Sequence, residues 1–305
     1  MKTLFEKLRP LLTALALCAA TPITLAADKL PVMVSFSILA DLVRVVGGER
    51  VAVTTLVGPD EDAHVFEPKP RDIKNILQTR LLIVNGLGFE PWVQKLVNAA
   101  GYKGQTVIAS QGVTTRALYA DKKGHTQAET DPHAWQDPTN VMIYVRNLTA
   151  ALSQLDPGGA ASYQSNSDAY VKELQALDAW AKEQFATLPF NKRKVITSHD
   201  AFGYLAAHYQ LRFTAPQGVS TEVEPSAKQV AQLIKQIQRE KIRAIFVENM
   251  SNPKLLAQLA KDVGVVVGAS LYADALSALD KPGSTYLKMM RHNVVQLVVG
   301  MRQND

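Results

Sequence analysis

Four side chains that can ligate a divalent metal ion lie in loop-like segments of this sequence. His64 occurs in GPDEDAHVFEP, His133 in DPHAWQDP, His199 in TSHDAF and Asp274 in LYADALS. Three imidazoles and one carboxylate suit a borderline cation such as Zn²⁺. The four residues are far apart in the chain, and no compact motif such as H-E-x-x-H joins them. They can form one site only if the fold brings their loops together.

The other three histidines are in contexts that point away from metal binding. His208 in LAAHYQL and His292 in MMRHNVV lie within helical patterns, so we expect them to serve packing or the surface. His125 stands alone in a polar stretch between residues 121 and 131, where a solvated side chain is the ordinary outcome. Whether it helps to collect metal is left open.

Short β-branched runs alternate with longer helical patterns in two parts of the chain. The runs are PVMVSFSI, VAVTTLV, LLIVNG and TVIASQGV in the first part, and KVITS, RFTA, IRAIFVE and VVVGASLYA in the second. Such alternation predicts an α/β fold with parallel sheets covered by helices. Ligands of such sheets bind at the carboxyl ends of the strands, which is where the four candidate loops fall.

A long helical pattern separates the two parts. Apolar residues from Tyr163 to Phe185 recur at spacings of three, four and seven residues, between Pro157 and Pro189. At 1.5 Å per residue such a helix is about 45 Å long, which is longer than a small domain is wide. We therefore expect an N-terminal lobe at 27–156, a connecting helix at 157–189 and a C-terminal lobe at 190–305.

The first 26 residues have the three parts of a secretory signal peptide: a basic start, an apolar run from Leu11 to Ala20, and small residues before a cleavage site at Ala26. We expect cleavage there and a periplasmic protein. Cys18, the single cysteine, could instead mark a lipidation site, but Leu17 precedes it where a small residue is needed. A mature chain without cysteine must hold metal through His, Asp or Glu.

The overall composition excludes several classes of protein. Apolar residues make up 47% and charged residues 20%, as in a folded globular protein. The net charge of +5 is spread along the chain, and some of it belongs to the leader. A protein that is exported and lacks a basic patch is not expected to bind nucleic acid.

Five segments together resemble the substrate-binding proteins of bacterial zinc and manganese ABC importers, the cluster A-I or family 9 solute-binding proteins. They are GPDEDAHVFEPKPRD, DPHAWQDP, TSHDAFGYL, EPSAKQV followed by FVENMSNPKLLAQLA, and LYADALS followed by GSTYLKMMRHNV. The resemblance implies two (β/α)4 lobes joined by one long rigid helix, with the metal between them. It also implies that an inner-membrane ABC permease receives the metal, and that the ligands are His64, His133, His199 and Asp274.

The third ligand position bears on which metal is bound. The resemblance associates His at position 199 with zinc and Glu with manganese, and three imidazoles favour Zn²⁺ on chemical grounds as well, so Mn²⁺ is the second choice. Two departures are a short stretch before His133, without the long His-rich loop of many zinc receptors, and Gln136 at a position that is usually apolar. We expect acid to release the metal, and burial to lower the pKa of the imidazoles.

Functions of other classes remain as alternatives. A zinc hydrolase or hydratase also uses three histidines, but it needs an open coordination position and a general base. Asp274 would occupy that position, and neither Asp200 nor Glu248 has a context that marks it as the base. A surface adhesin would favour a lipid anchor, for which Cys18 is poorly placed. We therefore expect no catalytic activity and a monomeric binding protein.

Overall fold

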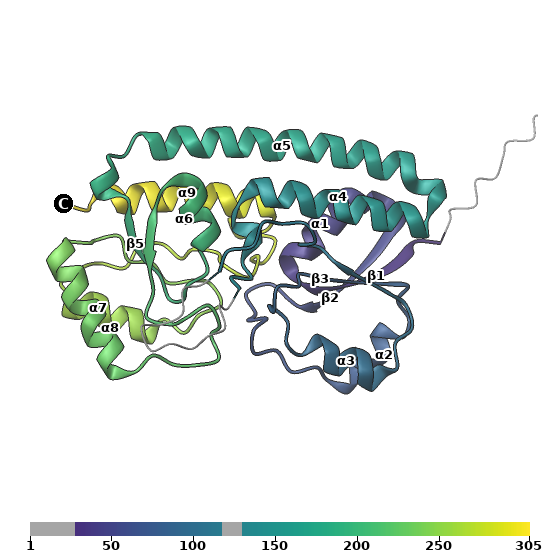
Figure 1. The fold of residues 1–305 in the computed structure, drawn as a ribbon, viewed down its shortest axis with the longest axis horizontal. Coiled ribbons are helices and arrows are strands. Elements are labelled where there is room, and N and C mark those ends of the chain that lie inside the picture. Colours follow the sequence, from purple (N-terminus) through teal and green to yellow (C-terminus); the bar gives the residue numbers. More distant parts are fainter. Residues whose placement is uncertain (1–27, 118–129) are drawn as a thin grey trace, which may run out of the picture.

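Two α/β halves lie side by side under one long helix (Figure 1). The structure, a computed structural model, describes residues 28–117 and 130–305. The predicted signal peptide, Cys18 and His125 lie outside these described ranges. Within the described ranges, the helices are too short or too polar to cross a membrane.

The N-terminal half is built on a four-stranded parallel sheet with the strand order β2-β1-β3-β4. The two central strands are buried almost throughout, as expected for a parallel sheet covered on both faces. Helices α1 and α4 lie on one side of the sheet and α2 and α3 on the other (Figure 1). The elements are β1 Leu30–Phe36, α1 Ser37–Gly47, β2 Val51–Val57, α2 Pro70–Ile76, β3 Leu81–Val84, α3 Val93–Ala100, β4 Gln105–Ile108 and α4 Pro138–Leu155.

The C-terminal half repeats this strand order with shorter pairing. Strands β5 and β6 pair in parallel, and two further segments join through isolated bridges, Ile196 to Ile245 and Glu248 to Leu271. The predicted third and fourth runs therefore appear as isolated bridges rather than as full strands, and Val266 in the fourth run is 87% exposed. The elements are β5 Lys194–Ile196, α6 Gly203–Tyr209, β6 Arg212–Thr214, α7 Ala227–Glu240, α8 Lys254–Asp262 and α9 Tyr286–Arg302.

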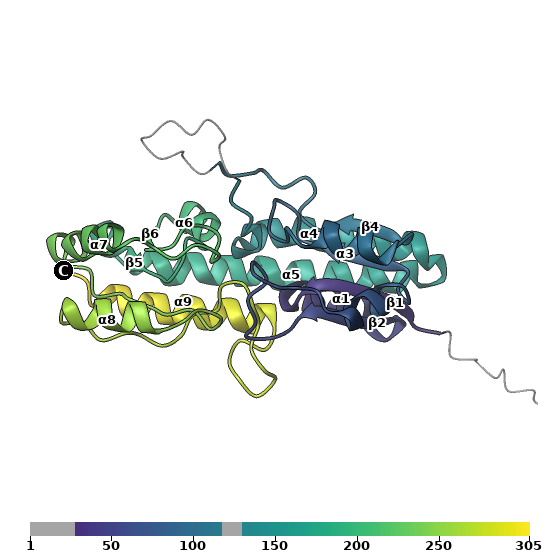
Figure 2. The same cartoon turned by 90° about the horizontal axis from the view of Figure 1, so that it is seen from below.

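Helix α5 (Ala160–Ala186) runs along α4 over the N-terminal half and along α9 over the C-terminal half (Figures 1 and 2). The apolar residues whose spacing predicted it, from Tyr163 to Phe185, are buried. Its 27 residues make it about 40 Å long. Its ends lie inside the predicted range: Pro157–Gly159 form a short 3-10 turn before it, and it ends three residues before Pro189, which disfavours helical backbone in the residue that precedes it. The α/β fold with two halves and a long connecting helix is confirmed, and the division at 156 and 189 stays a prediction.

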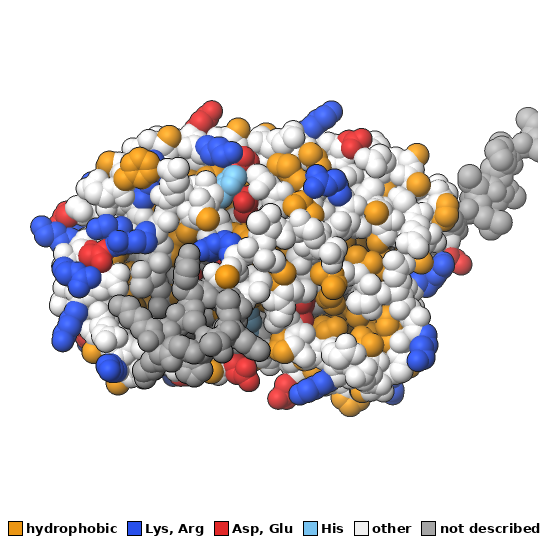
Figure 3. Space-filling model, in the orientation of Figure 1, with side chains coloured by type: hydrophobic (Ala, Val, Ile, Leu, Met, Phe, Trp, Pro, Cys, Tyr) orange, Lys and Arg blue, Asp and Glu red, His pale blue; other side chains and the backbone are white. Residues whose placement is uncertain are grey.

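Charged side chains of both signs are scattered over the surface in the view of Figure 3. Lys and Arg side chains lie at both ends of the molecule, with Asp and Glu side chains among them (Figure 3). Lys and Arg side chains predominate at the end of the molecule that carries α7 and α8 (Figures 1 and 3).

Candidate metal centre

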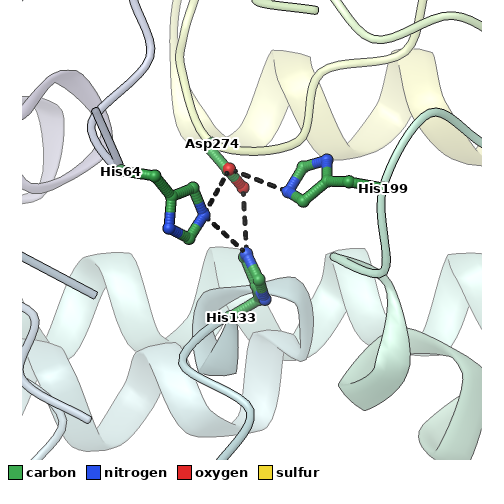
Figure 4. A group of neighbouring side chains, drawn as sticks. All are labelled: His64, His133, His199 and Asp274. Atoms are coloured by element: carbon green, nitrogen blue, oxygen red, sulfur yellow. Dashed lines mark hydrogen bonds and ion pairs between the residues drawn. The ribbon is translucent and has the colours of Figure 1, made fainter. Parts of the chain in front are cut away.

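The structure brings the four predicted ligands together between the two halves. His64 follows β2, His133 precedes the short turn Ala134–Gln136, His199 follows β5, and Asp274 follows the segment that pairs at Leu271. One nitrogen or oxygen atom of each residue lies within 4.8 Å of the corresponding atoms of the other three. Figure 4 shows all four side chains pointing at one another, two from each half.

The distances between donor atoms match the spacing of ligands around a small cation. The Nε2 atom of His64 is 3.3 Å from Nε2 of His133 and 3.2 Å from Oδ2 of Asp274. The Nε2 atom of His199 is 3.0 Å from the same oxygen, and Nε2 of His133 is 3.6 Å from Oδ1. Tetrahedral Zn²⁺ with bonds of about 2.0 Å places its ligand atoms about 3.3 Å apart. The cluster can therefore surround one ion with little movement.

The donor atoms are buried, and some of them lack ordinary hydrogen-bond partners. His133, His199 and Asp274 are 0% exposed and His64 is 8% exposed. Within the described residues, Nε2 of His199 and both oxygens of Asp274 contact only other candidate ligands, and none of these contacts has the geometry of an ordinary hydrogen bond. Buried polar atoms in folded proteins almost always have partners, so these orphaned atoms need an explanation. A bound cation would satisfy all three.

Two carboxylates orient the buried histidines by contacting the Nδ1 atom of each ring, while Nε2 faces the centre. Oδ1 of Asp131 lies 2.9 Å from Nδ1 of His133, and Oε2 of Glu248 contacts Nδ1 of His199. An Nδ1–H that donates to a carboxylate leaves the Nε2 lone pair free for a metal, and this arrangement is common at metal sites.

Each of these carboxylates is itself held in place. Asp131 accepts from Nη1 of Arg116 at 3.1 Å, and Glu248 accepts from the backbone N–H of Ser198 at 2.9 Å. Sequence reasoning missed the role of Asp131, although its position two residues before His133 was a usable signal. It considered Glu248 only as a possible base, because Glu248 is remote from His199 in the chain.

The charges around the site set the protonation of the metal-free protein. Burial lowers the pKa of His133, but Asp274 and Asp131 outweigh burial and raise that pKa to about 9. Burial likewise opposes the charged form of His199, yet Glu248 and Asp274 raise its pKa well above the ordinary value. The expectation that burial would lower the imidazole pKa values is therefore wrong for these two residues, because buried carboxylates face them.

The same interactions act in the opposite direction on Asp274. Burial raises its pKa, but the facing imidazoles of His199 and His133 outweigh burial and hold the pKa well below the ordinary value. In the metal-free centre these shifts favour the ionised form of the carboxylate and the protonated forms of the two facing imidazoles. A divalent cation that enters the site takes the place of these protons.

Two further histidines lie away from the centre, as predicted. His208 on α6 contacts Asp178 through Nε2 at 2.7 Å and Asp137 through Nδ1 at 3.3 Å. These contacts connect α6 to α5 and to the start of α4. His292 on α9 is half-buried, and its Nε2 lies 2.9 Å from the carbonyl oxygen of Ser270. Both residues serve packing and the surface.

We expect Asp131→Asn to weaken metal binding by about 10- to 100-fold, the usual cost of losing a carboxylate that orients a metal-binding histidine. Competition with a chelator of known affinity measures the change. Asp178→Asn is the matched control, because it alters a carboxylate that contacts His208 instead. Equal affinities of the Asp131→Asn variant and the parent would show that Asp131 does not orient a ligand.

Known proteins of similar sequence and structure are metal-transport components. The family model described as the periplasmic zinc-uptake complex component A matches residues 32–300. The metal ABC transporter substrate-binding lipoprotein SloC of Streptococcus mutans is 30% identical over 307 aligned residues, with 99% of this chain and 100% of the relative covered. The manganese-binding lipoprotein MntA of Halalkalibacterium halodurans is 32% identical over 276 residues, 90% of each chain.

A solved structure agrees with these similarities. The periplasmic zinc-binding protein TroA from Treponema pallidum superposes with a TM-score of 0.84 at 28% sequence identity, covering 90% of this chain and 99% of that chain. Its likeness extends over both halves and the connecting helix.

Proposed function

The chain belongs to the family of the periplasmic zinc-uptake complex component A, and on this basis we propose that it captures Zn²⁺ between its two halves and delivers it to an inner-membrane ABC permease. That it is a metal-binding receptor of an ABC importer follows from its relatives. The observation that supports the choice of site is the convergence of His64, His133, His199 and Asp274 within 4.8 Å. We propose that these four residues hold one ion.

The donor set favours zinc. Three imidazole nitrogens bind metals late in the Irving–Williams order more strongly than Mn²⁺, which prefers carboxylate, carbonyl and water oxygens. The relatives carry names for different metals, manganese for MntA and zinc for TroA. Mn²⁺ is therefore the second candidate, and the choice between the two rests on the chemistry of His199 and its neighbours.

Binding rather than hydrolysis fits the geometry. A catalytic zinc needs an open coordination position and a base near it. Asp274 faces the three histidines as a fourth ligand, and Glu248 is engaged by the ring of His199 and by backbone N–H groups. The relatives named above are likewise transport proteins rather than enzymes. We propose no catalytic residue and no adhesin role.

The protein acts outside the cytoplasm, as its relatives do. Some relatives are named as lipoproteins and others as periplasmic proteins. We propose the periplasmic form, with cleavage after Ala26, on the sequence pattern of the leader. We also propose that the receptor is a monomer and that a single chain binds the permease.

The metal content of protein isolated from its own periplasm, without added metal, tests the proposed function. We expect about one zinc ion per chain, as for a closed four-ligand site. Elemental analysis of the purified protein distinguishes the candidates directly. One equivalent of manganese would make the protein the manganese receptor, and protein that takes up neither metal even on titration would end the receptor proposal.

A further inference from the structure

The N-terminal half holds the backbone beside Asp274 through two buried side chains. Nε1 of Trp135 and Nε2 of Gln136 both donate to the carbonyl oxygen of Ala273, at 2.9 and 2.8 Å. One carbonyl thus accepts two hydrogen bonds from consecutive residues of the segment that carries His133. Ala273, the residue before Asp274, is thereby hydrogen-bonded to the N-terminal half.

The backbone that follows Asp274 is also hydrogen-bonded to the N-terminal half. The backbone N–H of Leu276 donates to Oγ of Ser37 at 2.9 Å, and the backbone N–H of Asp60 donates to the carbonyl oxygen of Leu276 at 2.8 Å. Ser37 and Asp60 belong to the N-terminal half. The carboxylate at position 274 is therefore presented by a loop that is attached on both sides to the half that supplies His64 and His133.

Gln136 is unusual among these anchors because its amide is incompletely satisfied. The residue is 0% exposed, its Nε2 bonds Ala273, and its Oε1 has no hydrogen-bond partner among the described residues. A buried acceptor without a partner destabilises a folded protein. An apolar side chain of similar size would fill the same space without that acceptor. What the amide contributes is the donor to Ala273.

We propose that Gln136 positions Asp274 and thereby favours Zn²⁺ over Mn²⁺. This inference rests on the proposed function, since it concerns selectivity at the same site. Zn²⁺ takes four ligands at short distances, whereas Mn²⁺ prefers more oxygen ligands in a larger, octahedral arrangement. To accommodate the larger ion, the loop at Asp274 must move away from His64 and His133. The hydrogen bonds to Ala273 oppose that movement.

The test is Gln136→Met, which keeps the length of the side chain and removes both the donor and the orphaned acceptor. We expect the Zn²⁺ affinity to fall by about tenfold, the lower end of the range for residues that position metal ligands, and the Mn²⁺ affinity to fall much less. The Tm of the metal-free protein should stay unchanged or rise, because a buried unsatisfied atom is lost. Competitive titrations and thermal unfolding measure these quantities.

Bound Co²⁺ supplies a spectroscopic readout of geometry. The parent should show the strong visible absorption of four-coordinate Co²⁺, and Gln136→Met should shift toward the weaker absorption of higher coordination. Gln154→Met is the matched control, because Gln154 lies exposed on α4 and bonds Gln105 instead. Trp135→Phe removes the other donor to Ala273 and should change the Zn²⁺ to Mn²⁺ ratio in the same direction.

An unchanged ratio of the two affinities in Gln136→Met would overturn the positioning role. So would equal losses for both metals together with a lower Tm, because that pattern describes a residue needed only for folding. Failure of the parent itself to bind metal is a separate result, which contradicts the proposed function and not the role of Gln136.

Discussion

His199→Ala is expected to weaken zinc binding by about 100- to 1000-fold, because each ligand of a four-coordinate zinc site carries roughly a quarter of a binding free energy of about 10–16 kcal/mol. His199 is 0% exposed and supplies one of the four converging donor atoms. Water cannot replace the imidazole at equal strength in a site built for nitrogen. Competitive titration of purified, metal-stripped protein measures the loss.

His208→Ala is the matched control for this experiment. His208 also contacts two carboxylates, Asp178 and Asp137, but it lies on α6 away from the centre. The His208→Ala variant should therefore bind zinc as tightly as the parent protein does. Circular dichroism of both variants shows whether they remain folded, since His199→Ala leaves Glu248 buried without its imidazole partner. A folded His199→Ala protein with parental zinc affinity would remove His199 from the coordination sphere.

The second large effect is on the pH dependence of binding. The pKa of His133 is raised to about 9 and that of His199 lies well above its ordinary value, because buried carboxylates face both rings. Both shifts favour a protonated ring near pH 7 in the metal-free protein, and His133 and His199 must each lose that proton to coordinate. Falling pH favours the protonated, metal-free form, and rising pH favours binding. Apparent zinc affinity should increase by about two powers of ten per pH unit above pH 7.

Zinc titrations between pH 6 and 8.5, corrected for the chelator's own protonation, measure this slope. Calorimetry in buffers of different ionisation enthalpy gives the protons released per zinc at fixed pH, which should be about two at pH 7. His199→Glu should lower the slope by about one, because its carboxylate replaces one of the protonated rings. An affinity that is flat above pH 7 would show that both imidazoles are already neutral without metal.

Local chemistry in the chain was sufficient to predict the elements that carry the site. The β-branched runs in the first half became the parallel strands. The apolar spacing from Tyr163 to Phe185 predicted the buried face of α5. These features depend on backbone preference and on periodic burial, which are properties of neighbouring residues. Residue types likewise pointed to His64, His133, His199 and Asp274 as the candidate ligands.

Contacts between distant segments decided the rest. Glu248 meets His199 through parallel pairing in the C-terminal half, and Gln136 meets Ala273 across the two halves, so neither partner is visible from spacing along the chain. The direction of the imidazole pKa shifts also depended on these contacts. Burial and a facing carboxylate act on a histidine with opposite signs, and the balance is set by distances that exist only in the folded molecule.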